Sequence, residues 1–202
     1  MEIKPQGGLI AEGRKIEGSR IYLRALSAQD VSDDYVQWMN DGDIIRYLTS
    51  RQGGYSEPEL KEYVDRMNAS ASDYLFGIFL KGSHTHIGNI KVGSIDALHK
   101  FADVGLIIGK KEEAGKGYGT EAIQLVTRYA FEQLHLNKLI AGMISENVGS
   151  YKAFVKAGYE EAGRLKRHVL FQGEYSDTIL MEKCQDVSPA LQNRRVAAGQ
   201  SI

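Results

Sequence analysis

The spacing of apolar residues changes twice along the chain, and each change predicts a different kind of element. Between residues 20 and 67, a short apolar run precedes two segments whose apolar residues recur every three or four positions, which indicates helices. Between residues 74 and 109, three apolar runs are separated by polar or glycine-containing turns, which indicates antiparallel strands. After residue 117 the helical spacing returns, and helical and strand-like segments then alternate.

The first part of the chain carries two helix-start signals. Residues 20–26 form a strand-like run, and the SAQD after it (27–30) matches a capping arrangement for a helix that reaches about Met39. The polar NDGD at 40–43 is expected to end that helix. The sequence SEPE at 56–59 repeats the start signal and places its proline in the first turn of a second helix.

The second part of the chain predicts a sheet with one parallel pair. A helix separates the strand-like run at 138–144 from the run at 101–109, so these two strands are expected to be parallel and joined by a right-handed crossover. A short helix over 148–158 and a closing hairpin around the QG at 172–173 follow. The predicted fold class is α+β, with a mixed, mostly antiparallel central sheet flanked by helices. The other two strands predicted in this part are 74–80 and 85–95.

Length and charge narrow the class of protein. The 202 residues suit one domain, and the formal charge of −1 gives no bulk electrostatic case for binding nucleic acid or an anionic membrane. No apolar run reaches the roughly 18 residues of a membrane span. The single cysteine, Cys184, fits a reducing compartment, so we expect a cytoplasmic protein. We expect a flexible leader over 1–18, the folded domain over 19–184 and a loose tail over 185–202.

The segment EEAGKGYGTEA, residues 112–122, places three glycines on alternate positions just before a predicted helix. Such a cluster suits a backbone that approaches an anion at a helix N-terminus. A P-loop is excluded: counted from Gly109, Ala114 takes the place of the second glycine, and Lys116 is followed by Gly117 where Ser or Thr is required. A dinucleotide fingerprint fails because Thr120 stands at its third glycine. A pyrophosphate loop and a plain tight turn both remain open.

A second segment, ENVGSYKAFVKAGY at 146–159, favours the pyrophosphate loop. Together with GKGYGTEA it resembles the GNAT superfamily of acyl-CoA-dependent N-acyltransferases, matching that family's pyrophosphate loop and the strand–helix segment that follows it. The earlier WMNDGDIIRYL at 38–48 looks like the branch that holds RimJ/RimL-type protein N-terminal acetyltransferases, spermidine acetyltransferases and amino-sugar acetyltransferases. The resemblance covers roughly residues 19–184.

The resemblance implies a donor site for acetyl-CoA. Strands 101–109 and 138–144 are expected to splay apart, so that the pantetheine arm of the donor lies in the gap. Asn147 and Ser150 are expected to face the pantetheine and thioester end. The backbone groups implied to bond the pantetheine amides belong to Leu106, Ile107 and Ile108. The residues implied to hold the pyrophosphate are Gly115, Lys116, Gly117, Tyr118, Gly119 and Thr120.

Two positions depart from the family's pattern. Ala114 stands where the family usually has Gln or Arg, so we expect weaker phosphate binding rather than none. Phe154 stands where the family often has a Tyr that can protonate the departing thiolate, which a phenyl ring cannot do. Ser150, one helical turn earlier, is our candidate for that role. The same serine could instead cap the start of the helix at 148–158.

The implied reaction is direct attack of a neutral amine on the acetyl thioester. An α-amine with a pKa near 8 is roughly a tenth neutral at pH 7, whereas a lysine-like amine near 10.4 is below a thousandth neutral. Candidate bases are Glu146, after the central strand, and Asp103, on the splayed strand. His86 and His168 are weaker choices, and each of the four could instead be structural or solvated. A backbone N–H on 104–108 is expected to meet the oxyanion.

The acceptor site is expected between the early helices and the sheet. Trp38, at helical spacing, could instead be a core residue. The candidates for contacting the acceptor are Trp38, Tyr47, Arg51 and Tyr55. Four acidic residues could attract a cationic acceptor or form a solvated face: Asp33, Asp34, Asp41 and Asp43.

The predicted function is acetyl-CoA-dependent N-acetylation of a primary amine, in the RimJ/RimL manner on a protein or peptide α-amine. Small-molecule acceptors remain as alternatives: the amino sugar of a nucleotide-sugar, a polyamine or an antibiotic. A non-catalytic acyl-CoA-binding module is a further alternative, motivated by Ala114 and Phe154, as is an unrelated fold with a fortuitous glycine turn. We expect no metal, because His and Cys lack ligand spacing, and no nucleic acid or membrane partner; a homodimer stays open.

Overall fold

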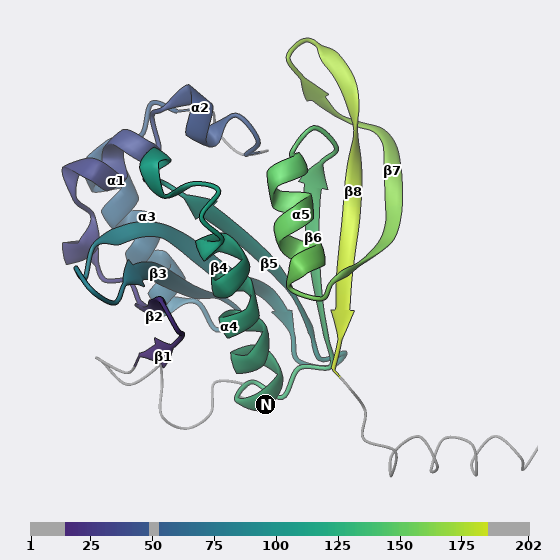
Figure 1. The fold of residues 1–202 in the computed structure, drawn as a ribbon, viewed down its shortest axis with the longest axis horizontal. Helices are drawn as coiled ribbons and strands as arrows, with labels where there is room; N and C mark the ends of the chain where they lie inside the picture. The colour runs from purple at the N-terminus through teal and green to yellow at the C-terminus, as the bar shows by residue number, and fades with distance from the viewer. Residues whose placement is uncertain (1–14, 49–52, 186–202) are drawn as a thin grey trace, which may run out of the picture.

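The structure is a computed structural model that describes residues 15–48 and 53–185. Its strands and helices alternate around one mixed sheet (Figure 1). The strands are β1 (Ile16–Glu17), β2 (Ile21–Ala25), β3 (Tyr74–Leu80), β4 (His86–Asp96), β5 (Phe101–Ile108), β6 (Lys138–Ile144), β7 (Glu160–Phe171) and β8 (Glu174–Cys184). The α-helices are α1 (Asp33–Trp38), α2 (Gly42–Ile45), α3 (Glu57–Ala69), α4 (Tyr118–Glu132) and α5 (Val148–Lys156), and two 3-10 turns are η1 (Ala28–Asp30) and η2 (Lys111–Glu113).

The sheet is antiparallel except at its centre. Its strand order is β1-β2-β3-β4-β5-β6-β8-β7, and only β5 and β6 run parallel. Their pairing starts at Phe101 and Lys138 and ends at Asp103 and Ile140, although β5 continues to Ile108. The two strands therefore part after three residue pairs, which confirms the expected splay and the expected mixed, mostly antiparallel α+β fold.

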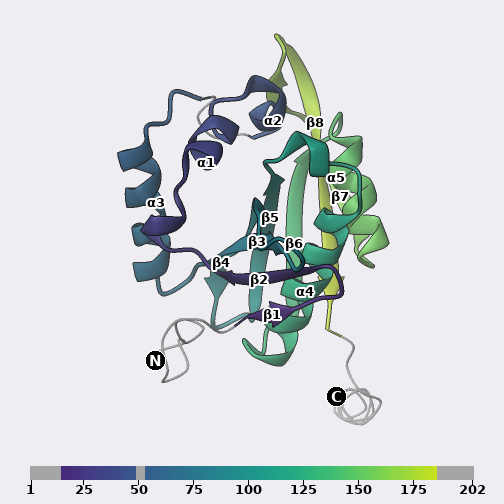
Figure 2. The same cartoon turned by 60° about the vertical axis from the view of Figure 1, so that its left-hand side comes forward.

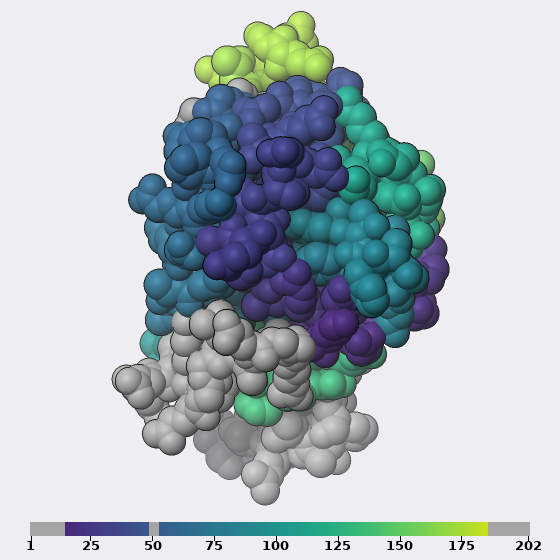
Figure 3. All heavy atoms as spheres, turned by 90° about the vertical axis from the view of Figure 1, so that its left-hand side faces the viewer, coloured from purple at the N-terminus to yellow at the C-terminus, as the bar shows by residue number. Residues whose placement is uncertain are grey.

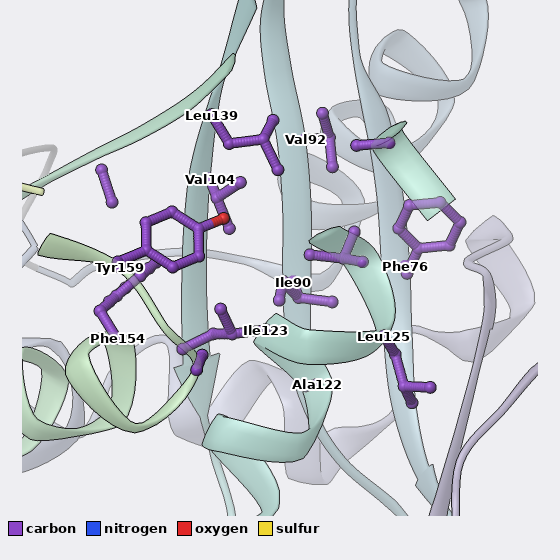
Figure 4. Close-up of a cluster of buried hydrophobic side chains, with 14 of the residues drawn as sticks. Phe76, Ile90, Val92, Val104, Ala122, Ile123, Leu125, Leu139, Phe154 and Tyr159 are labelled. Atoms are coloured by element: carbon purple, nitrogen blue, oxygen red, sulfur yellow. The ribbon is translucent and has the colours of Figure 1, made fainter. Parts of the chain in front are cut away.

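Helix α4 covers one face of this sheet because its apolar residues recur at helical spacing. Its inward side chains meet those of β4 and β5 in one core cluster (Figure 4). Each large apolar side chain buried in this way contributes about 1.5–3 kcal/mol to folding. Those labelled in Figure 4 include Ile90, Val92, Val104, Ala122, Ile123, Leu125 and Leu139.

Helices α1 and α3 cover the opposite face, so the domain has three layers (Figure 2). Every residue of β3 from Tyr74 to Phe79 is buried, as expected for a strand packed on both faces. The β7–β8 hairpin extends past these layers, and its end projects above the early helices in Figure 3. Its turn, Gln172–Gly173, has positive φ at both residues, which suits a tight two-residue hairpin.

Three boundaries differ from those expected. The single helix expected up to Met39 is divided into η1 and α1, because Ser32 interrupts it and accepts a new capping bond from the Tyr35 N–H at 3.3 Å. The NDGD segment does more than end a helix, since Asp41 caps α2 by accepting from the Asp43 N–H. Residues 16–17, assigned above to the leader, form β1 and pair with β2.

Candidate active site

The glycine loop leads directly into α4, whose N-terminus lies at the surface. Gly115 and Gly117 have φ of 75° and 87°, a left-handed conformation that glycine adopts without the strain of a side chain. Gly117 is the N-cap of α4, and no side chain among the described residues caps it. The first N–H groups of a 15-residue helix are thus left to an exogenous partner, and the helix dipole favours an anion there.

Arg20, directly before β2, contacts this loop through its side chain. The sequence did not identify it as a site residue. Its Nη1 donates to the Lys116 carbonyl at 2.9 Å, and its Nε donates to Glu121 Oε2 at 3.0 Å. Its guanidinium lies over the Tyr118 ring, 4.7 Å from the centroid. The Lys116 ammonium forms an ion pair with Glu113 at 2.9 Å. No local signal marks Arg20, because it lies 96 residues from the carbonyl it bonds.

A hollow of about 320 Å³ lies beside the loop. Two cationic side chains line this hollow. Arg20 directly precedes β2, and Lys156 is the last residue of α5. An open helix N-terminus flanked by two cations fits a diphosphate-bearing donor and supports the pyrophosphate interpretation over a plain turn. The hollow is lined by Ser19, Arg20, Gly117, Thr120, Glu121, Gln124 and Lys156.

The gap between β5 and β6 leaves one edge of β5 without a strand partner. Leu106, Ile107 and Ile108 pair on one side with β4, at Ile90, Asn89 and Gly88. On the other side the ladder to β6 has already ended. Backbone groups on that side suit an extended ligand that bonds as a strand does, so these three residues lie where a pantetheine arm could run.

Three candidates follow β6 at the open end of the gap. Asn147 caps α5 by accepting the Ser150 N–H on its Oδ1 at 3.1 Å. The alternative in which Ser150 itself caps the helix is therefore wrong, and the cap is Asn147. The Ser150 hydroxyl has no hydrogen-bond partner among the described residues and is half-buried, so it stays available for chemistry.

Glu146 lies in a small hydroxyl network. Ser176 Oγ donates to Glu146 Oε2 at 2.5 Å, and Ser145 Oγ donates to the same oxygen at 3.1 Å. The hydrogen bond from Ser176 lowers the pKa of the Glu146 carboxyl. Glu146 therefore stays ionised at neutral pH and is a weak base. Ser176, on β8, was not identified from the sequence.

The other candidate bases, Asp103, His86 and His168, lie on β5, β4 and β7. Asp103 is exposed at the closed end of the gap, where it pairs with Ile140, and three residues of strand, about 10 Å, separate it from Leu106. His86 stacks on Phe79 with ring centroids 4.8 Å apart, and burial lowers its pKa. His168 is exposed on β7. The structure thus does not bring Asp103 together with Glu146, whereas His168 directly precedes Val169, which pairs with the Ser176 that bonds Glu146.

The three described acceptor candidates differ in what they pack against. Trp38 is 5% exposed, and its ring lies so close to Gly109 that a Cβ there would sit 2.0 Å from Trp38 Cδ2, so packing accounts for it. The Tyr47 ring stacks on Phe171 of the β7–β8 hairpin, with centroids 5.5 Å apart and planes at 20°. Tyr55 is half-buried against the α1–α3 cluster. Arg51 lies outside the described residues.

Three of the four early acidic residues are already paired with lysines. Lys110 Nζ lies 2.7 Å from Asp34, and Lys111 Nζ lies 2.8 Å from Asp41 and 3.0 Å from Asp43. These ion pairs join α1 and α2 to the segment between β5 and the glycine loop. Two lysines thus offset part of the charge of three carboxylates.

A family model described as "Acetyltransferase (GNAT) domain" matches residues 20–160, which is most of the domain described above. The chain belongs to this GNAT family. The GNAT reaction moves an acyl group from acetyl-CoA to an amine. The earlier binding-only alternative and the unrelated-fold alternative therefore give way to an acyltransferase.

Individual GNAT proteins resemble the chain over most of its length. The Bacillus subtilis (strain 168) protein "Probable N-acetyltransferase YjcK" is 31% identical over 170 residues, covering 80% of this chain and 92% of that protein. The Escherichia coli (strain K12) "[Ribosomal protein uS5]-alanine N-acetyltransferase" is 27% identical over 122 residues, covering 58% and 60%. Among solved structures, spermidine N-acetyltransferase from Vibrio cholerae, in complex with CoA and spermine, has a TM-score of 0.76 at 25% identity, covering 83% and 97%.

Two further observations concern the described residues alone. Within 15–48 and 53–185, no group of three His, Cys, Asp or Glu side chains could hold a metal ion. No helix in that part of the chain is long and apolar enough to cross a membrane.

Proposed function

We propose that this GNAT enzyme acetylates the α-amine of a protein or peptide. The observation that carries the proposal is the weakness of the available bases. Glu146 has a lowered pKa, and His86 is packed among aromatic rings. A site of this kind suits an amine that is already partly neutral at pH 7, as an α-amine is, and suits a polyamine poorly.

The charge on the acceptor side supports the same choice. Asp34, Asp41 and Asp43 are paired with Lys110 and Lys111, so they offer less net negative charge to a polyamine than three unpaired carboxylates would. The uS5-alanine N-acetyltransferase named above acts, by its name, on a protein alanine. That relative supports an α-amine acceptor for this chain.

We assign the donor to the glycine loop and the gap. Backbone N–H groups from Gly115 to Thr120, together with Arg20, hold the diphosphate, and Arg20 compensates for the missing side chain at Ala114. Backbone groups of 106–108 hold the extended arm. Bound acetyl-CoA supplies the thioester, and the chain orients it.

Side chains of the protein are proposed to carry out the two proton transfers of the reaction. The amine nitrogen forms a bond to the acyl carbon, the carbon–sulfur bond breaks, and the sulfur leaves as a thiolate. We assign the Ser150 hydroxyl to protonate that thiolate while it takes a proton from water in the same step, since Phe154 cannot, and a backbone N–H of 104–108 to meet the oxyanion. Glu146 holds the amine and passes its proton to water, a modest task when the amine pKa is near 8.

A polyamine is the second candidate, because the spermidine N-acetyltransferase structure matches nearly its whole length to this chain. Amino-sugar acceptors remain a further small-molecule alternative. The single Cys184 fits a reducing compartment, which supports a cytoplasmic location for the proposed reaction.

The test is release of CoA thiol from acetyl-CoA with three acceptor sets: peptides with a free α-amine, aminated nucleotide-sugars, and polyamines. We expect the highest kcat/KM with a peptide set. Turnover with polyamines alone would overturn the acceptor assignment, and CoA binding without transfer to any set would revive the binding-only alternative.

A further inference from the structure

Three polar residues are buried in the described part of the chain, and one of them has an unusual partner. Thr127 bonds to the Tyr159 hydroxyl at 2.9 Å, and Asn89 bonds to His86 at 2.8 Å, so both are satisfied inside the packed layers. Ser176, 7% exposed, instead bonds to the exposed carboxylate of Glu146. Its hydroxyl therefore links the interior of the sheet to the mouth of the site.

The hydroxyl protons show how the network is ordered. Ser145 Oγ and Ser176 Oγ lie 3.0 Å apart, and both contact Glu146 Oε2. These three contacts share only two hydroxyl protons. The shortest contact, at 2.5 Å, joins Ser176 Oγ to Glu146 Oε2, so Ser176 donates its proton there. Oε2 is thus held from two sides, while neither serine holds Oε1.

The backbone fixes where this network lies. The β6–β8 ladder runs to Ile144 and Thr178, and the Ser145 N–H donates to the Asp177 carbonyl at 3.0 Å. These bonds set the two serines side by side at the open end of the β5–β6 gap, beyond the last β5–β6 pair. A side chain placed by a paired strand is positioned more rigidly than one on a free loop.

We propose that Ser176, assisted by Ser145, is a positioning residue that aims the Glu146 carboxylate at the acceptor amine. Ser176 fixes Oε2 and leaves Oε1 to meet the amine. The proposal rests on the proposed function for what Oε1 meets, but the hold on Glu146 can be measured without any reaction.

Charged or titratable residues of β7 and β8 lie near this network, and they include His168, next to the Val169 that pairs with Ser176. Asp177, the next residue on β8, repels the Glu146 carboxylate. Asp177 accepts from Lys166 Nζ at 2.8 Å and from the Arg167 N–H at 2.9 Å, which reduces that repulsion. The Ser176 hydrogen bond is the largest influence on the Glu146 pKa, so its removal should raise that pKa.

The experiment is a pH titration of the side-chain carboxyl ¹³C signals in the full chain, with Glu146→Gln to assign the Glu146 signal. We expect the Glu146 pKa to rise in Ser176→Ala and to return toward the wild-type value in Ser176→Thr, which restores a hydroxyl. Thr178→Val is the matched control, since it removes a hydroxyl two residues along the same strand and should leave the Glu146 signal unchanged. An unchanged Glu146 titration in a folded Ser176→Ala protein would overturn the proposal.

Kinetics then separate this proposal from the proposed function. With a reactive acceptor, Ser176→Ala should lower kcat roughly ten-fold and leave acetyl-CoA affinity unchanged, and Ser176→Thr should recover most of the lost kcat. Normal kcat in a folded Ser176→Ala protein would show that the orientation has no catalytic role. If the titration shifts as expected while wild-type protein acetylates no amine, the hold on Glu146 stands and the proposed function fails.

Discussion

The proposed donor side and the proposed acceptor side of this enzyme are built in different ways. On the donor side, backbone groups do most of the work: a glycine loop, an open helix N-terminus and an unpaired strand edge. On the acceptor side, side chains from distant segments meet, as Tyr47 of the early region does with Phe171 of the hairpin. The difference teaches that backbone sites are marked by local sequence motifs, whereas side-chain sites depend on tertiary contacts.

The largest effect should come from Gly117→Glu on the donor side. A side chain at φ 87° is strained, its Cβ would lie 3.3 Å from Arg20 Nη2, and its charge would repel a diphosphate. We expect acetyl-CoA affinity to fall by at least roughly a hundred-fold, measured by calorimetry. Gly117→Ala imposes the strain without the charge and should bind far better than Gly117→Glu. Equal loss in both variants, or wild-type affinity in Gly117→Glu, would contradict the loop assignment.

Ser150→Ala should have the next largest effect, and on a different quantity. Loss of the hydroxyl removes the proposed proton donor but leaves the Asn147 cap intact, because that cap uses the Ser150 backbone N–H. We expect kcat to fall by roughly ten- to a hundred-fold with acetyl-CoA affinity unchanged. Ser83→Ala, in the β3–β4 turn, is the control. A normal kcat in Ser150→Ala would mean that water protonates the thiolate.

The glycine loop, the splayed strands and the helix at α5 could be predicted because each carries its own local signal. Gly117 and its neighbouring glycines indicate a loop, and Gly158 indicates the end of α5, whereas the cap at Asn147 was not predicted. Arg20 and Ser176 could not be predicted, since each acquires its meaning only when folding brings it to a residue 96 or 30 positions away. Trp38, at helical spacing, was a candidate for contacting the acceptor. That spacing does not distinguish a ligand contact from packing against Gly109, which is what the structure shows.

Phe171→Ala tests the acceptor side. Loss of the stack with Tyr47 removes a contact worth about 0.5–1.5 kcal/mol beyond its area, so we expect KM for the acceptor to rise by roughly three- to ten-fold. Acetyl-CoA affinity should not change. Tyr175→Ala removes an exposed aromatic ring from the same hairpin and should leave both quantities near wild type. A change in acetyl-CoA affinity with an unchanged acceptor KM would contradict the assignment of Phe171 to the acceptor side.

The smallest effect should come from Lys111→Gln, which removes the ion pairs that join α2 to the donor side. The pairs are solvent-exposed, so their contribution is small and is screened by salt. We expect acceptor KM to change about two-fold at low salt and less at high salt. Lys61→Gln breaks an exposed ion pair with Glu57 on α3 and serves as the control. A salt-independent change would show that the lysine acts by another route.

The pH dependence of kcat/KM for a lysine-free peptide, compared with spermidine, tests the central claim most directly. A site with only weak bases leaves deprotonation to the amine's own pKa. We therefore predict that the peptide is the better substrate and that its kcat/KM rises to a plateau with an apparent pKa of about 8. Faster turnover of spermidine at pH 7, or a peptide profile that is already flat at that pH, would contradict the account.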